Sequence, residues 1–192
     1  MNKALEVLRS GGIILYPTDT VWGIGCDATD ENAVRKVFQI KKRSDSKSLV
    51  LLAADMDMVA EYVNELPFMA AQLVEVNDKP MTIIYPGAIV QDAATKQGLA
   101  PSCVAEDGSV GIRVPMANEF VRSLLERFGK PIVSTSANIS GEATPRSFGE
   151  ISEDILQAVD FVVDRKLEAD STGRSSQIIS LGLGGEVKII RP

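Results

Sequence analysis

The sequence contains no histidine, only two cysteines and one tryptophan among 192 residues. Without imidazole, this chain has no histidine-based catalytic triad, no histidine general acid or base and no histidine-ligated zinc site. Cys26 and Cys103 lie far apart and form no CxxC motif, which favours two separate thiols in a reducing compartment. Its chemistry must come from lysine, arginine, hydroxyl, amide and carboxylate groups, from the backbone, or from a bound metal.

Long apolar runs are also missing, because no stretch of about 18 apolar residues is present. The first residues, MNKALEVLRSGG, carry Glu6 and Arg9 in an amphipathic pattern unlike the apolar segment of a signal peptide. The sequence therefore predicts a cytoplasmic protein without membrane contact. Its length fits a single domain over residues 1–192. Its net charge of −6 is atypical of a dedicated nucleic-acid binder.

Short apolar runs alternate with amphipathic segments along the chain, which predicts an α/β fold with helices on the faces of a sheet. The expected strands are residues 13–16, 48–53, 81–85, 110–114, 131–136, 161–164, 177–180 and 187–190. The expected helices are residues 4–10, 31–41, 56–63, 67–76 and 118–128, and one reaching about residue 159 after a capping box of Ser147 and Glu150. The last two strands, joined by LGLGG, indicate a hairpin and hence a mixed sheet.

Polar segments adjoin several of these strands, and ligands of open α/β sheets bind at strand ends. The segment KKRSDSK holds four cations in seven residues, which is typical either of a solvated helix end or of an anion site. The segment STSAN, residues 134–138, could cap the backbone of a loop or line a crevice that binds a polar ligand. Asp19 could contact a metal, but no second carboxylate lies at a convincing spacing.

The segment GIGCDA only weakly resembles a dinucleotide-binding fingerprint, since six residues separate its first glycine from the end of the preceding strand. Gly23 and Gly25 are better interpreted as tight-turn glycines. Trp22 could form a ring wall for a ligand or cover the core, and we favour the core.

Taken in order, several motifs closely resemble the YrdC/TsaC family over nearly the whole chain. They are LYPTDTVWGIGCDA, the K-x-R of KKRSDSKSLVLL, GIRVP, STSANISG, GRSSQIISL and the final IIRP. The resemblance implies a twisted open mixed sheet with a concave, cation-lined groove. It also implies synthesis of L-threonylcarbamoyladenylate from L-threonine, bicarbonate and ATP, with release of pyrophosphate. That product would supply adenosine 37 of tRNAs reading ANN codons, through a downstream tRNA threonylcarbamoyl transferase machinery, with tRNA bound weakly or indirectly.

The resemblance also implies two sets of site residues. The expected contacts of L-threonine are Thr20, Arg113, Ser136 and Ser176. The expected contacts of ATP are Lys41, Arg43, Lys47, Ser109, Asn138, Arg146 and Arg191. Lys41 and Arg43, the two cations of K-x-R, would also be catalytic. Mg²⁺ would bridge the phosphates of ATP, held largely by substrate and water rather than by protein ligands.

The sequence departs from the family pattern in places. NDKPMT stands for the usual W-P-G-P-x-T and keeps Pro80 and Thr82, while Gln177 and Ser48 replace a common threonine and proline. These changes bear on the shape of one groove wall. Two alternatives are a YciO-like nucleotide-binding paralogue without synthase activity and an RNA-binding module. The retained K-x-R and S-x-N argue against the first, and the net charge and scarce aromatics against the second.

Overall fold

The computed structural model describes residues 1–42, 49–92, 94, 97–115 and 117–192, except the side chains of residues 169 and 170. The helices of this part are α1 (Asn2–Arg9), α2 (Glu31–Ile40), α3 (Met56–Ala60), α4 (Ala70–Val76), α5 (Glu119–Phe128) and α6 (Glu153–Ala158), with 3-10 helices η1 (Pro101–Cys103), η2 (Phe148–Glu150) and η3 (Arg165–Asp170). The strands are β1 (Ile14–Pro17), β2 (Trp22–Gly25), β3 (Val50–Leu52), β4 (Met81–Tyr85), β5 (Val110–Arg113), β6 (Ile132–Val133), β7 (Thr135–Ser136), β8 (Phe161–Val162), β9 (Gln177–Leu181) and β10 (Val187–Arg191).

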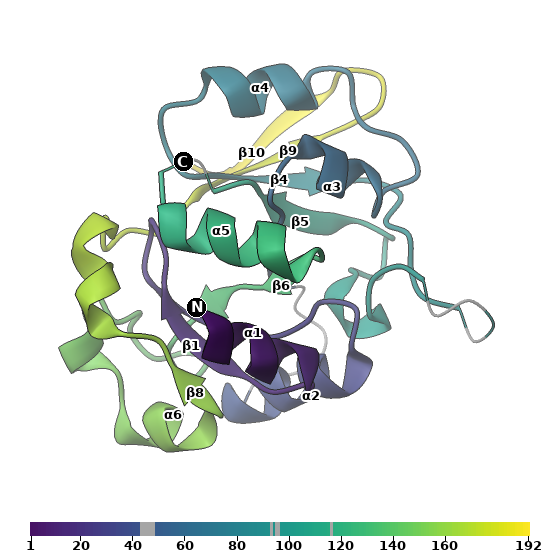
Figure 1. Cartoon of the computed structure of the whole chain (residues 1–192). Helices are drawn as coiled ribbons and strands as arrows, with labels where there is room; N and C mark the ends of the chain where they lie inside the picture. The colour runs from purple at the N-terminus through teal and green to yellow at the C-terminus, as the bar shows by residue number, and fades with distance from the viewer. Residues whose placement is uncertain (43–48, 93, 95–96, 116) are drawn as a thin grey trace.

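The strands form two mixed sheets, with the orders β7-β2-β1-β8 and β10-β9-β4-β5-β3-β6. The predicted α/β class, the mixed pairing and the antiparallel β9–β10 hairpin are confirmed (Figure 1). The sheets meet where the chain crosses from one to the other. Strand β6 pairs with β3 in the larger sheet, the chain passes through Ser134, and β7 pairs with β2 in the smaller sheet. The segment STSAN is therefore a bridge between two sheets.

Helix ends follow the capping residues in the sequence. The Asp30 carboxylate accepts hydrogen bonds from the N–H groups of Asn32 and Ala33 at the start of α2. The Asn118 side chain caps α5 in the same way, and Gly129 ends that helix at a φ of 76°. Each cap satisfies backbone groups that a helix end leaves open. Helices α1 and α5 lie side by side (Figure 1), and together they cover a second, smaller core cluster.

The predicted capping box is wrong. Ser147 makes no side-chain cap bond, and the next three residues form the short helix η2. The Glu150 carboxylate instead accepts from the backbone N–H of Arg146 at 2.8 Å, so it satisfies a loop donor rather than a helix end. The expected helix begins only at Glu153, after Ser152.

The prediction of tight-turn glycines is also wrong, because Gly23 and Gly25 lie within β2 and pair with β1. The close approach of neighbouring groups explains the glycine at position 25. A Cβ there would lie 2.6 Å from the ring of Tyr16 and 2.7 Å from the carbonyl oxygen of Val133. Trp22 is confirmed as a core residue, since it is fully buried and packs against Phe148.

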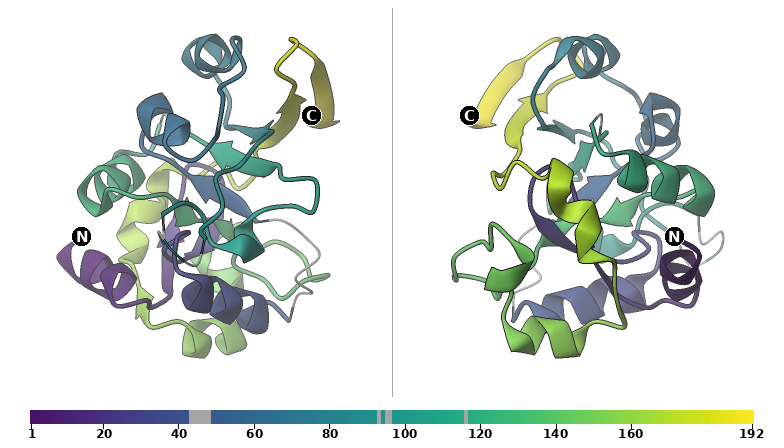
Figure 2. Two further views of the ribbon diagram at one scale, coloured as in Figure 1. Left: turned by 90° about the vertical axis from the view of Figure 1, so that its right-hand side faces the viewer. Right: turned by 60° about the vertical axis from the view of Figure 1, so that its left-hand side comes forward.

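The main core draws on both sheets and on the helices that cover them. Cys26 and Cys103 are buried in it as separate thiols. At the other extreme, β10 is exposed along its whole length and forms the outer edge of the larger sheet (Figure 2). No helix in the described part of the chain is long and apolar enough to cross a membrane.

Candidate functional site

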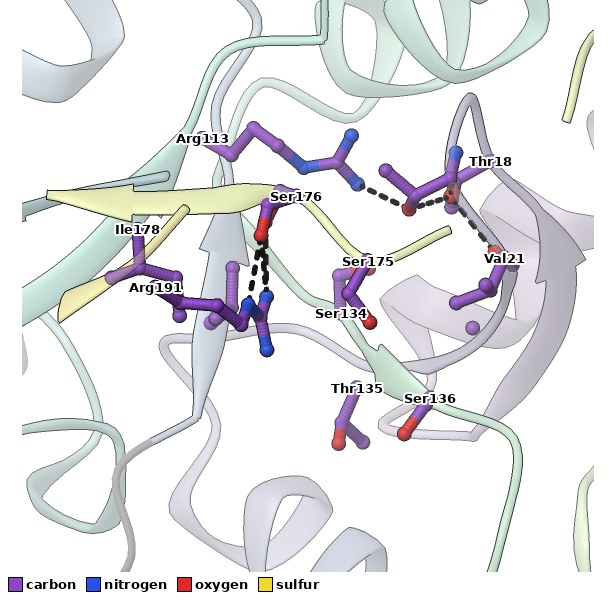
Figure 3. A pocket seen from close by; sticks show the side chains of 13 residues that line it. Thr18, Val21, Arg113, Ser134, Thr135, Ser136, Ser175, Ser176, Ile178 and Arg191 are labelled. Atoms are coloured by element: carbon purple, nitrogen blue, oxygen red, sulfur yellow. Dashed lines mark hydrogen bonds between the residues drawn. The ribbon is translucent and has the colours of Figure 1, made fainter. Parts of the chain in front are cut away.

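A cavity of about 270 Å³ lies at the junction of the two sheets (Figure 3). We call it the junction cavity. Its lining consists of Thr18, Thr20, Val21, Gly23, Val50, Arg113, Ser134, Thr135, Ser136, Ser175, Ser176, Ile178 and Arg191. These residues come from segments far apart in the sequence, and most of them carry a hydroxyl or guanidinium group. The cavity is therefore suited to a small polar ligand.

Arg113 supplies the most deeply buried positive charge of the cavity. It ends β5, and only 3% of its surface is exposed. Its guanidinium forms an ion pair with the equally buried Asp19, from the loop that follows β1. A buried charge is tolerated when it is paired in this way. Asp19 is thus the counter-ion of Arg113, and its carboxylate holds the guanidinium in place at the cavity wall.

The loop after β1 is held by its own hydroxyl groups. Thr18 Oγ1 lies 2.8 Å from the carbonyl oxygen of Val21 and 2.8 Å from Thr20 Oγ1. It also accepts the backbone N–H of Thr20 at 3.1 Å. The carbonyl of Thr20 in turn accepts the hydroxyl of Ser171 at 2.7 Å. Neither threonine is more than 5% exposed, so these bonds are shielded from water.

The bridge STSAN is anchored from two sides. The N–H of Ser134 donates to the carbonyl of Val50 at 2.8 Å, and β7 pairs with β2. Behind the bridge, Lys41 follows α2 and is almost fully buried. Its Nζ donates to the carbonyl oxygens of Ser136, at 2.5 Å, and Asn138, at 2.7 Å. Because its backbone is fixed in this way, the bridge presents the side chains of Ser134 and Ser136 to the cavity.

Ser176 and Arg191 form the opposite wall (Figure 3). The Ser176 hydroxyl lies 2.8 Å from that of the buried Thr82. Arg191 reaches in from β10, and its Nε and Nη2 donate to the Ser176 carbonyl at 2.9 and 2.7 Å. Partial burial lowers the pKa of Arg191 from its ordinary value. The end of an exposed strand therefore braces the site.

The structure brings together five of the residues predicted from the sequence. All four expected contacts of threonine line the junction cavity, and so does one expected contact of ATP. The five are Thr20, Arg113, Ser136, Ser176 and Arg191. Lys41 lies directly behind them, bonded to the bridge rather than lining the cavity. Arg43 and Lys47 fall outside the described residues, so the cation-lined groove stays a prediction.

Three other predicted ATP contacts do not line the junction cavity. Ser109 donates to Asp107 and lines a separate cavity beside Lys188, about 13 Å along the extended chain from Arg113. Arg146 is exposed and lines another cavity, with residues 171–174. Asn138 donates from its side-chain amide to two carbonyl groups of its own loop, at 3.0 Å each. Its Oδ1 is buried and has no partner among the described residues.

Sequence reasoning left part of the site unassigned. The polar residues Thr18, Asp19 and Thr20 could equally form a capped loop or line a crevice, and the structure places Thr18 and Thr20 in the cavity lining. The pairing of Asp19 with Arg113 joins positions 94 residues apart, and no local pattern connects them. Ser175 also lines the cavity, and nothing in GRSSQ separates it from Ser176. No group of three or more histidine, cysteine, aspartate or glutamate residues in the described part could hold a metal.

Fold and site together define an α/β protein with a cavity, lined mostly by hydroxyl and guanidinium groups, at the junction of its two sheets. A family model for Sua5, YciO and YrdC proteins, described as "Telomere recombination", matches residues 6–192. The chain belongs to this family.

Curated relatives support the assignment. The threonylcarbamoyl-AMP synthase of Aliivibrio fischeri is 33% identical over 151 residues, which cover 79% of this chain and 78% of the relative. The enzyme of the same name from Psychromonas ingrahamii is 36% identical over 140 residues, 73% of this chain and 70% of the relative.

Solved structures share the fold. P. abyssi Sua5 complexed with L-threonine is 28% identical with a TM-score of 0.81, over 93% of this chain and 50% of that one. E. coli YciO is 25% identical with a TM-score of 0.73, over 99% of this chain and 87% of that one. The chain spans about half the length of the Sua5 structures.

Proposed function

We propose that the protein is an L-threonylcarbamoyladenylate synthase, which condenses L-threonine, bicarbonate and ATP into threonylcarbamoyl-AMP and pyrophosphate. The observation that carries the proposal is the convergence of Thr20, Arg113, Ser136 and Ser176 on one cavity. Curated relatives bear the name of this activity, and a Sua5 structure of the same fold contains L-threonine. Transfer to tRNA by downstream machinery, weak or indirect tRNA binding and a cytoplasmic location are part of the same proposal.

The junction cavity suits an amino acid. Its volume of about 270 Å³ admits a small molecule, and Arg113 offers a guanidinium that can pair with a carboxylate. Asp19 offsets the charge of Arg113, and the ion pair joins Asp19 Oδ1 to Nη1 of the guanidinium. The hydroxyls of Ser136 and Ser176 supply further polar contacts, and Val21, Val50 and Ile178 supply apolar ones.

The proposed reaction needs little proton transfer by protein groups. The amine of threonine attacks the carbon of bicarbonate, a C–N bond forms, and water leaves to give a carbamate. A carbamate oxygen then attacks the α-phosphorus of ATP, and the bond to the pyrophosphate breaks. Catalysis would come from positioning and from cations that offset charge on the phosphates. This suits a chain without histidine.

We place ATP next to the threonine pocket, towards Arg191 and the STSAN bridge. Lys41 would act there by holding the carbonyl groups of Ser136 and Asn138, while Arg43 and Lys47 would meet the phosphates. Arg146 would add positive charge at the edge of the site. Ser109 is not part of this proposed site, because it lines a different cavity.

Mg²⁺ would enter as the partner of the ATP phosphates. The described residues offer no carboxylate cluster that could hold it as a resident ion, and Asp19 is engaged by Arg113. Substrate oxygens and water are therefore the ligands that we propose for it.

The test is pyrophosphate release by the purified chain. We expect release to require L-threonine and bicarbonate together, and mass spectrometry to detect the threonylcarbamoyl adenylate. Arg113→Ala should abolish the threonine-dependent release of pyrophosphate, whereas Arg122→Ala, on an exposed face of α5, should leave it intact. Equal ATP turnover without threonine would contradict the proposal and favour a YciO-like paralogue.

A further inference from the structure

The hydroxyl groups of Thr20 and Thr18, in the wall of the junction cavity, form a hydrogen-bonded series that runs to the carbonyl of Val21 in one fixed direction. Thr18 Oγ1 lies 2.8 Å from the carbonyl oxygen of Val21, which can only accept a hydrogen bond. A hydroxyl has one hydrogen and two lone pairs, so the hydrogen of Thr18 goes to Val21. The short contact of 2.8 Å between the two threonine hydroxyls must therefore be a bond that Thr20 donates and Thr18 accepts. The backbone N–H of Thr20 occupies the second lone pair of Thr18.

This direction fixes what Thr20 can offer to a ligand. Its only hydroxyl hydrogen is committed to Thr18, so Thr20 Oγ1 presents lone pairs alone to the junction cavity. Nη2 of Arg113 approaches one side of that oxygen at 3.4 Å. The cavity thus sets a pure acceptor, Thr20, beside a pure donor, Arg113. Thr20 repels a carboxylate and accepts an amine N–H, whereas Arg113 binds a carboxylate.

We propose that Thr18 is a positioning residue that keeps the Thr20 hydroxyl an acceptor, and that the amino acid consequently binds with its amine at Thr20 and its carboxylate at Arg113. The inference rests on the proposed function and deepens it. An amine that donates one N–H to Thr20 is held in place, and its lone pair is free for the attack on bicarbonate. Thr18 itself touches no reacting atom and acts only through Thr20.

The first test replaces the Thr18 hydroxyl by a methyl group of similar shape. In Thr18→Val, the hydroxyl hydrogen of Thr20 loses its acceptor and can turn into the cavity, where it opposes the amine. We expect KM for L-threonine to rise about tenfold, the factor that corresponds to one hydrogen bond of ordinary strength. KM for ATP should change much less, and Thr18→Ser should restore the wild-type KM for threonine. Thr29→Val is the matched control, because that hydroxyl bonds to Asp27 outside the junction cavity.

A double-mutant cycle separates positioning from a structural role. If Thr18 acts only through the Thr20 hydroxyl, Thr18→Val combined with Thr20→Val should raise KM for threonine no more than Thr20→Val alone. The inference would be overturned if the fold-changes of the two single variants multiplied in the double variant. It would also be overturned if Thr18→Val changed KM for threonine and KM for ATP equally, or left KM for threonine unaltered. If Thr18→Val does not fold, Thr18→Ala takes its place in the cycle, and circular dichroism checks each variant.

The outcomes for the two proposals remain distinct. A wild-type protein that releases no pyrophosphate in response to threonine overturns the proposed function, and the inference fails with it. An active wild type with a normal threonine KM in Thr18→Val overturns the inference alone.

Discussion

Arg113 and Asp19 show how one buried pair serves both stability and binding. Both side chains are about 5% exposed or less, and they form an ion pair with each other. Such a pair contributes little net stability compared with an apolar contact, but breaking it leaves a charge buried alone. Asp19 therefore serves as the counter-ion that allows Arg113 to lie buried in the cavity wall.

Removing the charge of Asp19 should therefore destabilise the protein strongly. We expect Asp19→Asn to lower the free energy of unfolding by about 3 kcal/mol. Urea titration followed by the fluorescence of Trp22, the sole tryptophan, measures this change. The control is Glu6→Gln, which breaks an exposed pair with Lys3 and should cost at most about 0.5 kcal/mol. An equal loss of unfolding free energy in both variants would show that the buried pair contributes no more to stability than the exposed one.

At the scale of elements, the end of α2 supports the bridge between the sheets through Lys41. Lys41→Met keeps the apolar stem but removes the donors of two hydrogen bonds. We expect a loss of about 2 kcal/mol in unfolding free energy and a higher KM for both substrates, because Ser136 and Asn138 are then less firmly held. Unchanged stability with a raised KM for ATP alone would mean that Lys41 serves the phosphates and not the bridge.

For the hairpin of β9 and β10 we expect a different outcome, in which a substitution impairs substrate binding but leaves stability nearly unchanged. Strand β10 is exposed throughout, so it adds little buried area, yet Arg191 braces Ser176 with two hydrogen bonds. We expect Arg191→Ala to leave the melting temperature nearly unchanged and to raise KM for threonine about tenfold, with any direct loss of an ATP contact added to it. Lys188→Ala, on the same strand but outside the junction cavity, is the control. A change in KM for ATP alone would contradict the bracing role.

Elements with strong local signals could be predicted from the sequence. Asp30 and Asn118 each cap a helix that also has an apolar face, so cap and pattern agree. Strand β2 was missed because its two glycines resemble a turn, while their cause is the crowding of Tyr16 and Val133 across the sheet. The capping box failed because Glu150 has a competing local donor, the N–H of Arg146. In both cases a contact that is not part of the sequence motif decided the structure.

The candidate site was predictable to a similar degree. Motif order and the family resemblance predicted that Thr20, Arg113 and Ser136 share one site, and all three line the junction cavity. The separation of Ser109 from that cavity follows from its place at the far end of β5, which a motif does not convey. The direction of the hydroxyl chain at Thr18 could not be predicted either, because it depends on distances to Val21.

At the scale of the whole molecule, the two sheets share one core although their hydrogen-bond ladders are separate. The main apolar cluster contains Leu15 of the smaller sheet, Leu51 of the larger sheet, Trp22 and both cysteines. Neither sheet can lose its packing without exposing part of this cluster. We therefore expect a single cooperative unfolding transition in urea. Trp22 fluorescence and exposure of the thiols should show the same midpoint, and two separated midpoints would mean that the sheets unfold independently.

The thiols also give this transition a dependence on pH. Burial raises the pKa of Cys26 and of Cys103 above the ordinary value of 9.0, and the nearby Cys103 raises the pKa of Cys26 further. Native thiols therefore stay protonated at pH 8 and should not react with a disulfide reagent, whereas both should react in denaturant.

Because the folded pKa values are raised, the thiols' contribution to stability is fully present below pH 9 and is lost as the pH rises further. Urea midpoints measured between pH 7 and about 10 should fall only at the alkaline end, and Cys26→Ala should reduce that fall. Rapid reaction of either thiol in the native protein at pH 8 would contradict the burial on which the argument depends.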